Sequence, residues 1–335
     1  MTLLRRVGLP TAASFDAAVL FFPDDRIAAT LAGKNVVVES DDASLLSALF
    51  IAFGDGGAVD DLPFFRAVFA QRTLRASING SPLAPRELFF GLEDPNCPYR
   101  LEDDTIFYRD DDSAQFTIEN DVIRVHETPR WRVAVTALLS RGFLHFIDDL
   151  VLFHAAAAGI RGNGALFVAA RESGKSTIAL ALASRGHEFL SDEYGCYDTA
   201  THELLPYRRP VGIREGPRAA AISLALARGA YRGIPHEDAI RVDLGSLIPL
   251  APPRRVPLRM VVFLEGFADR PRLRLATEDE NRVEMLRTLY SSLITSTHAR
   301  RTLDILRMLS RTRVMHLEMG DPDQTAALLE EELGS

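Results

Sequence analysis

The sequence predicts an α/β protein built from two parts: a smaller mixed α+β part at 1–128 and a larger α/β part at 129–335. In the larger part, short apolar runs of strand length alternate with helical patterns, which is typical of an α/β domain. Residues 99–126 instead contain short apolar runs separated by Asp- and Asn-rich turns, which is typical of an antiparallel meander. The boundary near residue 129 is not rich in Gly or Ser, so we expect the two parts to pack together.

The composition is that of an ordinary globular protein with an acidic balance. Of the 335 residues, 47% are hydrophobic and 25% are charged, and the formal net charge at pH 7 is −8. A general nucleic-acid binder would be basic overall or would carry a basic stripe. We therefore expect no nucleic-acid partner.

Cysteine usage and apolar segments bear on the cellular compartment. Cys97 and Cys196 are far apart and have no metal-binding or redox spacing, which suggests a reducing compartment. Arg5 and Arg6 are not followed by a long apolar core, so we expect no signal peptide. The apolar run at 150–160 is too short to cross a bilayer. These features predict a cytoplasmic protein without a membrane partner.

The first part begins with strands and one helix. Asp41 and Asp42 can cap a helix that has apolar residues on one face. Asn79-Gly80 is a turn signal after a run that alternates like a strand. We therefore expect strands at 15–22, 35–39 and 73–78 and a helix at 44–53.

The meander consists of three predicted strands, at 105–109, 114–119 and 122–126. Three consecutive aspartates, Asp110 to Asp112, lie between the first two. They lack the alternating acidic spacing, central Gly and closing Glu of a calcium loop, so we interpret them as a solvated turn. Pro129 then opens a predicted helix at 131–149, and we expect the boundary between the two parts here.

The second part alternates strands with helices. We expect strands at 151–159, 165–169, 188–191, 194–197, 202–207, 256–264 and 314–317. Helices are expected at 178–185, from 217, at 281–296, at 300–310 and from 322.

One strand–loop–helix segment, at 167–177, has the pattern of a phosphate-binding loop (P-loop). Gly174-Lys175-Ser176 matches the end of that pattern, where an apolar strand gives way to a helix. In such a loop, backbone N–H groups and the positive end of the helix dipole point at one spot, where a polyphosphate can lie. Lys175 would reach the β- and γ-phosphates, and the Ser176 hydroxyl would hold Mg²⁺. The predicted nucleotide-binding residues are Arg171, Glu172, Ser173, Gly174, Lys175, Ser176 and Thr177.

Two positions depart from the full loop pattern. Ala169 stands where the pattern has its first Gly, and Glu172 stands where many such loops carry another Gly. A methyl group at 169 can often be accommodated, whereas a carboxylate at 172 risks facing the phosphates. The loop pattern is therefore incomplete, and by itself it does not establish a phosphate site.

Further residues accompany the loop in a fixed order. His154 lies in a predicted strand 21 residues before Lys175 (175 − 154), and a Gly-rich turn at 162–164 follows that strand. Asp192 and Glu193 end a strand to which one helix returns, and Asp192 lies 17 residues after Lys175 (192 − 175). This spacing can bring both carboxylates beside the phosphates of a nucleotide. Phosphoryl transfer needs such a set: a phosphate cradle, a cation, a carboxylate for the metal and a base for the attacking hydroxyl.

With these residues, the chain resembles the C-terminal domain of HPr kinase/phosphorylase, and still more the shorter bacterial kinases related to it, including those that phosphorylate lasso-peptide precursors. The resemblance covers about 150–265, continues weakly to the end of the chain and does not cover 1–128. The residues that carry it are His154, Gly162, Gly164, Gly174-Lys175-Ser176-Thr177, Arg185-Gly186-His187 and Ser191-Asp192-Glu193.

The resemblance implies a P-loop nucleotide-binding domain of HPr kinase type that uses ATP and Mg²⁺. It implies that Asp192 is the general base for a serine-type hydroxyl and that His154, beside it, tunes or polarises the acidic pair. Lys175 completes the catalytic set. Ser176, Asp192 and Glu193 would be the metal site, with Glu193 standing where the family usually has a second Asp. The family also forms oligomers, so a homo-oligomer is an expectation.

Other charged residues near the expected site have less certain roles. Arg208, Arg209 and Arg214 could contact phosphate or an acidic substrate, or could be solvated or ion-paired surface residues. The family has a further metal-binding Glu in this region, but Glu203 and Glu215 are out of register with it.

Three functions remain open at this stage, of which the first is preferred. The first is a kinase that transfers the γ-phosphoryl group of ATP to a hydroxyl of a peptide, protein or small molecule. The second is a nucleotide-binding pseudo-kinase in which Ala169 and Glu172 have removed turnover. The third is a scaffold that keeps only the fold. Residues 1–128 would recognise the acceptor, because they have no nucleotide role, and the acceptor itself is not identified.

Overall fold

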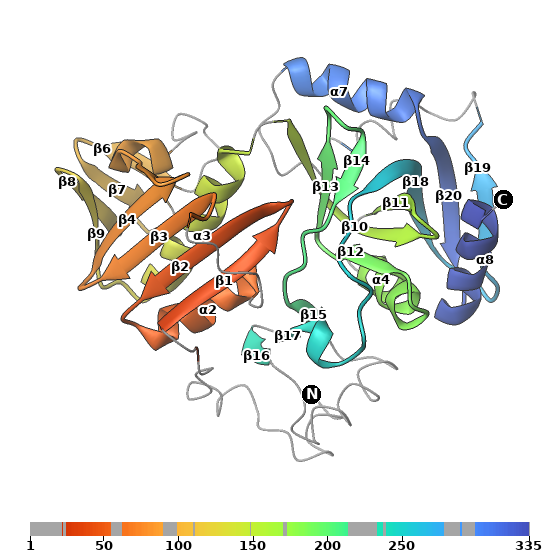
Figure 1. Cartoon of the computed structure of the whole chain (residues 1–335), viewed down its shortest axis with the longest axis horizontal. Coiled ribbons are helices and arrows are strands. Elements are labelled where there is room, and N and C mark those ends of the chain that lie inside the picture. The colour runs from red at the N-terminus through yellow and green to blue at the C-terminus, as the bar shows by residue number, and fades with distance from the viewer. Residues whose placement is uncertain are drawn as a thin grey trace, which may run out of the picture. The chain divides into compact units, whose positions relative to one another are not determined.

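The computed structural model describes residues 22, 25–54, 62–89, 99–109, 111–147, 149–169, 173–213, 233–236, 239–277, 289 and 299–334. The chain divides into two compact units (Figure 1). Unit 1 comprises Met1–Ile147 and Arg209–Asp243, and unit 2 comprises Asp148–Arg208 and Leu244–Ser335. Most of the strand expected at 15–22, the helix expected to begin at 217 and the helix expected at 281–296 lie outside the described residues.

In the described part of unit 1, nine strands form one sheet in the order β1-β2-β3-β4-β9-β8-β7-β6, with β5 paired to β4. The pair β2–β3 is parallel and the other pairs are antiparallel. The strands are β1 (Arg26–Leu31), β2 (Lys34–Ser40), β3 (Phe65–Ala70), β4 (Thr73–Ile78), β5 (Ser81–Pro82), β6 (Tyr99–Glu102), β7 (Thr105–Tyr108), β8 (Ala114–Glu119) and β9 (Val122–Val125). The predicted strands at 35–39, 73–78, 105–109, 114–119 and 122–126 are confirmed, whereas β1, β3, β5 and β6 were not predicted.

A second, three-stranded sheet of unit 1 has the order β15-β17-β16. Its antiparallel strands are β15 (Val211–Ile213), β16 (Gly233–His236) and β17 (Ala239–Val242). None of these three strands was predicted. Unit 1 also contains the short 3₁₀ helix η3 (Pro85–Leu88).

Helix α2 (Ala43–Phe53) forms where the sequence predicts it, and both of its ends are capped. The Asp42 side chain accepts a hydrogen bond from the backbone N–H of Leu45 at 2.9 Å, which satisfies one of the free donors at the first turn. The N–H of Gly54, which has φ 70°, closes the last turn on the Phe50 carbonyl at 2.8 Å. The local sequence therefore determines both ends of this helix.

Helix α3 (Trp131–His145) is anchored in unit 1 by its aromatic residues. The Phe143 ring lies edge-on to Phe53 and Phe65, at 6.1 Å and 6.0 Å between ring centroids. At the other end of the helix, Trp131 stacks on Phe69. The helix ends four residues earlier than predicted. It was expected to open the second part, but these contacts place it with the residues before it, and the roles assigned to 1–128 and 129–335 remain predictions.

Unit 2 combines a mixed sheet with helices. The strands in its described residues are β10 (Leu150–Ile160), β11 (Asn163–Val168), β12 (Glu188–Ser191), β13 (Tyr194–Asp198), β14 (Glu203–Leu205), β18 (Val256–Phe267), β19 (Arg272–Leu275) and β20 (Arg313–Met319). The helices are α4 (Lys175–Ser184), η4 (Leu244–Ser246), α7 (Ala299–Ser310) and α8 (Pro322–Gly334). Apart from β19 and η4, every one of these elements overlaps a predicted one or extends it by a few residues. No helix in the described ranges is both long enough and apolar enough to span a membrane.

Strand β10 lies at the centre of the unit 2 sheet. The strand order is β11-β10-β13-β14-β18-β20-β19, with β12 also paired to β10 and β11 also paired to β18. The pairs β11–β18 and β18–β20 are parallel, and the others are antiparallel. Because β12 and β13 both run along the edge of β10 opposite β11, residues 188–198 follow one line that is interrupted at Asp192 and Glu193.

The two faces of β10 carry different helices. Phe153, Ala155 and Ala157 lie in a buried core cluster together with Ile305 and Met308 of α7. Helix α4 contacts β10 and β12, and α8 contacts α4 and β10. In Figure 1, α7 lies apart from α4 and α8 in this unit. Since successive side chains of a strand alternate between its faces, the even-numbered residues of β10, including His154, face away from this cluster.

A charged cluster ties the end of α4 to α8. Arg185 donates two hydrogen bonds to the Glu330 carboxylate, at 2.5 Å and 2.8 Å, and His187 Nε2 lies 2.8 Å from Glu330 Oε1. The hydrogen bond from Arg185 is the largest cause that lowers the pKa of Glu330, from 4.5 to about 2. Arg185 and His187 therefore have a structural role, because they hold the end of α4 against α8.

This cluster predicts a loss of stability in acid. Because the folded pKa of Glu330 is lowered, its contribution is fully present above about pH 4.5 and disappears as the pH falls towards 2. We expect Glu330→Gln to lower the urea midpoint at neutral pH and to match the wild type near pH 2. Glu331→Gln, at the exposed neighbouring position, is the control. If the urea midpoints of the wild type and Glu330→Gln differ by the same amount from neutral pH to pH 2, the prediction is contradicted.

Candidate functional site

The expected phosphate loop begins at the end of a fully buried strand. Val168 of β11 is paired with Ala155 of β10 on one side and with Phe263 of β18 on the other. Both edges of the strand are therefore occupied, and the chain leaves the sheet at a defined point. Arg171 and Glu172 lie outside the described residues, which resume at Ser173. The effect of a carboxylate at position 172 on the loop therefore remains an open prediction.

Gly174 is the residue on which the chain turns into α4. Its φ of +89° lies in the left-handed region, where residues with a side chain are strained. Unlike Asp42 at the start of α2, Gly174 provides no side chain to cap the helix, and the first turn of α4 carries no acidic residue. The start of α4 therefore presents the positive end of a helix dipole without a side-chain cap from Gly174, which suits the binding of an anion.

The surroundings of Gly174 predict a specific mutational effect. A Cβ at this position would lie 2.7 Å from Met319 Sδ, and Met319 is buried. Gly186 has nearly the same φ, +87°, but a Cβ there would meet no atom within 4 Å. We expect Gly186→Ala to cost about 1–2 kcal/mol through backbone strain alone. Gly174→Ala should cost about 1–3 kcal/mol more, because the buried thioether must move.

Urea denaturation of the two glycine variants measures this difference. A Gly174→Ala/Met319→Ala double variant tests its cause, since relief of the close contact should appear as a coupling energy between the two sites. Equal costs for the two single variants would show that the approach of Met319 does not constrain the loop.

Lys175 is the first residue of α4, and its side chain turns back over the loop. The residue is 7% exposed, and its Nζ donates a hydrogen bond to the Ala169 carbonyl at 2.9 Å. Burial lowers the pKa of this ammonium group. A positive charge is thus held between the first residue of the loop and the start of the helix.

Ser176 and Asp192 meet across the interruption in the sheet edge. Ser176 Oγ lies 3.5 Å from Asp192 Oδ2, and Asp192 is 3% exposed. The Ser191 hydroxyl accepts hydrogen bonds from the N–H groups of Tyr194, at 2.8 Å, and Glu193, at 3.3 Å. Ser191 therefore stabilises the turn between β12 and β13 that carries Asp192 to the start of α4.

His154 and Glu193 lie in the same region of the sheet. His154 is opposite Tyr194 in the register of β10 and β13, two residues from Asp192, and is half-buried. Glu193 is also half-buried. Over the described residues, no group of three or more His, Cys, Asp or Glu side chains is placed to hold a metal ion. Of the three predicted metal ligands, Ser176 and Asp192 have oxygen atoms within hydrogen-bond distance of each other.

The charged residues that follow the site have structural partners. Arg208 donates Nε to the Phe189 carbonyl at 2.6 Å and Nη2 to the Ala251 carbonyl at 2.7 Å, and burial lowers the pKa of its guanidinium. This arginine therefore joins two backbone segments, a role that the sequence did not indicate. Glu203 pairs with Arg255 at 3.4 Å.

The remaining candidate residues are two arginines, one glutamate and the two cysteines. Arg209 belongs to the segment grouped with unit 1, and Arg214 and Glu215 lie outside the described residues. Cys97 also lies outside them, and Cys196 is a free, buried thiol whose pKa is raised by burial. A thiol of this kind is a poor nucleophile.

The chain is similar to the structure of the Hpr(Ser) kinase/phosphatase from Coxiella burnetii, with 14% sequence identity and a TM-score of 0.25. The match covers 55% of this chain and 93% of that chain. No protein-family model matches the sequence, and no curated protein matches it. The function of the chain is therefore inferred from its own residues.

Proposed function

We propose that unit 2 binds ATP with Mg²⁺ and transfers the γ-phosphoryl group to a serine-type hydroxyl of a peptide, protein or small molecule. The proposal depends above all on one observation, the distance of 3.5 Å between Ser176 Oγ and Asp192 Oδ2 at the start of α4. This contact unites the end of the phosphate-loop pattern with the carboxylate that the sequence places 17 residues after Lys175.

The start of α4 is suited to the triphosphate. Backbone N–H groups at a helix start bind phosphate oxygens, and Gly174 has no side chain that would cap them. The buried Lys175 ammonium adds a full positive charge at the same place. Burial of this ammonium group costs free energy, as its lowered pKa indicates, and a bound phosphate would offset that cost.

The donor set beside the helix is suited to Mg²⁺. This ion is usually bound through one or two carboxylates together with substrate phosphates, and it keeps several waters, so it does not need a cage of three protein side chains. Ser176 and Asp192, with Glu193 adjacent, would supply its protein oxygens. When bound, the ion would neutralise charge on the β- and γ-phosphates.

Asp192 would also act on the acceptor. Its carboxylate would take the proton of the hydroxyl as the hydroxyl oxygen bonds to the γ-phosphorus and the bond between that phosphorus and the β–γ bridging oxygen breaks. The products are ADP and a phosphate ester. Because Asp192 is almost fully buried, water has little access to it, and a base shielded in this way favours a bound acceptor over hydrolysis.

Two measurements on the full chain test the proposal. ATP with Mg²⁺ must raise the melting temperature, since a ligand that binds only the folded state stabilises it. ADP must then form from ATP, slowly without an acceptor and faster with a serine-containing peptide library. A rise in melting temperature without any turnover would support the pseudo-kinase alternative, and no effect of ATP in either assay would reject both.

A further inference from the structure

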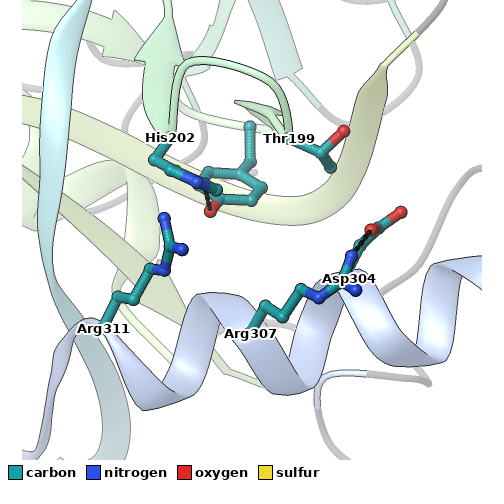
Figure 2. A pocket seen from close by; sticks show the side chains of 6 residues that line it. Thr199, His202, Asp304, Arg307 and Arg311 are labelled. Carbon is teal, nitrogen blue, oxygen red and sulfur yellow. Dashed lines mark hydrogen bonds and ion pairs between the residues drawn. The ribbon is translucent and has the colours of Figure 1, made fainter.

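A polar cavity lies in unit 2, between α7 and the turn that joins β13 to β14. Its volume is about 380 Å³, which is within the range of small-molecule sites. In Figure 2, Arg311 points towards His202, and Arg307 reaches towards Asp304. The lining residues are Tyr197, Thr199, His202, Asp304, Arg307 and Arg311.

This cavity is separate from the phosphate loop. In the β10 register, His154 and Tyr194 pair near the loop, whereas Leu150 and Asp198 pair near the cavity. Four residues of strand separate the two pairs, which is about 13 Å at 3.3 Å per residue. Tyr197 also belongs to the core cluster that includes Ile305 and Met308 of α7, on the face of β10 away from α4. A nucleotide at Lys175 would therefore not fill this cavity.

Three charged side chains line the α7 side of the cavity, and the side chain of Arg307 is 68% exposed. Arg307 Nη1 lies 3.8 Å from Asp304 Oδ1, a distance too long for a hydrogen bond. Arg311 lies one helical turn beyond Arg307, on the same side of α7 (Figure 2). Two guanidinium groups and one carboxylate thus face one volume, with a net charge of +1.

Asp304 is the unusual member of this set. Its side chain is 8% exposed, and its Oδ2 atom is buried without a hydrogen-bond partner among the described residues. A carboxylate oxygen buried without a donor costs free energy, and such groups are rare in folded proteins. Asp304 lines the cavity, so a cationic group bound there would lie beside this carboxylate.

The opposite wall of the cavity is held in place by its own hydrogen bonds. The Tyr197 hydroxyl and His202 Nδ1 share a hydrogen bond of 2.8 Å, and their rings stack. The Thr199 hydroxyl donates to the Asp149 carbonyl at 3.1 Å. Burial raises the pKa of Tyr197, so this hydroxyl stays protonated and adds no charge. The charge of the cavity is therefore set mainly by its α7 side.

We propose that this cavity binds a small amino dicarboxylate, a molecule with two carboxylates and one ammonium group. Arg307 and Arg311 would each bind a carboxylate, and the Asp304 carboxylate would pair with the ammonium group. The cavity offers two positive charges and one negative charge. These complement the two negative charges and one positive charge of the ligand. This inference does not depend on the proposed phosphoryl transfer.

Isothermal titration calorimetry of the full chain with three probes tests the assignment. The probes are L-glutamate, glutarate, which is the same dicarboxylate without the ammonium group, and inorganic phosphate. We expect L-glutamate to bind at least about tenfold more tightly than glutarate, as loss of a charge-assisted hydrogen bond implies. Phosphate should bind more weakly than L-glutamate.

Variants assign the binding to the cavity. Asp304→Asn should remove the preference for L-glutamate over glutarate, and Arg311→Ala should weaken both by at least about tenfold. Arg254→Ala, which removes an exposed arginine outside the cavity, is the matched control and should leave both affinities unchanged. No binding of any probe, equal affinities for L-glutamate and glutarate, tighter binding of phosphate, or an unchanged affinity in Arg311→Ala would overturn the proposal.

Discussion

Replacement of Asp192 by Asn is expected to lower the rate of phosphoryl transfer by about 10²–10⁴-fold, the usual contribution of a general base. The amide keeps the shape of the side chain and can remain in contact with Ser176, but it cannot take a proton. The measurement is the rate of phosphate transfer from labelled ATP to an accepting peptide. Binding of ATP without Mg²⁺ should be retained or strengthened, because one negative charge beside the phosphates is removed.

Asp269→Asn is the matched control for this experiment. Asp269 is an exposed aspartate of unit 2 outside the site, so the same substitution there should leave transfer unchanged. Wild-type transfer in Asp192→Asn would show that another group takes the proton. Loss of transfer together with loss of Mg²⁺-free ATP binding would show that the substitution had damaged the site as a whole.

Lys175→Met is expected to have two opposite effects. Nucleotide affinity should fall by about 10²-fold, because the charge that faces the phosphates is removed. Stability without nucleotide should rise, because Met fills the same space without a buried charge. The measurements are ATP binding by calorimetry and the urea midpoint of the unliganded protein. A variant that loses stability and keeps nucleotide affinity would contradict both the burial cost and the role of Lys175.

The pH dependence of Lys175 has a definite sign. Burial lowers its folded pKa below 10.5, so over the interval between the two pKa values the unfolded state binds more protons than the folded state. Stability of the unliganded protein should therefore rise with pH across that interval, and this rise should be absent in Lys175→Met. A bound phosphate would favour the charged form and raise the folded pKa.

The sequence makes this pKa directly measurable. Lys34 and Lys175 are the only two lysines among the 335 residues, so ¹³C-methylated protein should give two lysine resonances. Lys34→Arg identifies the resonance of Lys175. Addition of ATP should shift the titration of that resonance to higher pH, and a titration that ATP leaves unchanged would argue against phosphate binding at this lysine.

The phosphate-loop region was predictable because its parts are close in sequence. His154, Lys175 and Asp192 lie within one stretch in which a strand, a helix and a returning strand have ordinary lengths. Standard strand and helix geometry then decides where each residue lies in the sheet. The contact of Ser176 with Asp192 follows from this spacing, and the turn stabilised by Ser191 supplies the final approach.

Other features could not be predicted from local sequence patterns, because they depend on contacts between distant parts of the chain. Strand β1 is rich in alanine, and β16 and β17 are four residues each, so their strand propensity is weak until a partner strand is present. Helix α3 joins unit 1 through Phe143 and its aromatic neighbours, which no boundary signal in the sequence reveals. The cavity near α7 unites residues about one hundred positions apart, such as His202 and Arg307, and no motif connects them.

The close approach of Met319 to Gly174 has a practical consequence for anyone who wishes to shorten the protein. All the residues in the phosphate-loop hypothesis lie between 154 and 193, yet the wall that shapes the bend comes from the last strand, β20, which pairs with β18. A fragment trimmed before residue 313 would retain every motif residue but lose that wall. We expect such a fragment to fail in nucleotide binding, so expression trials should keep the carboxyl-terminal segment intact.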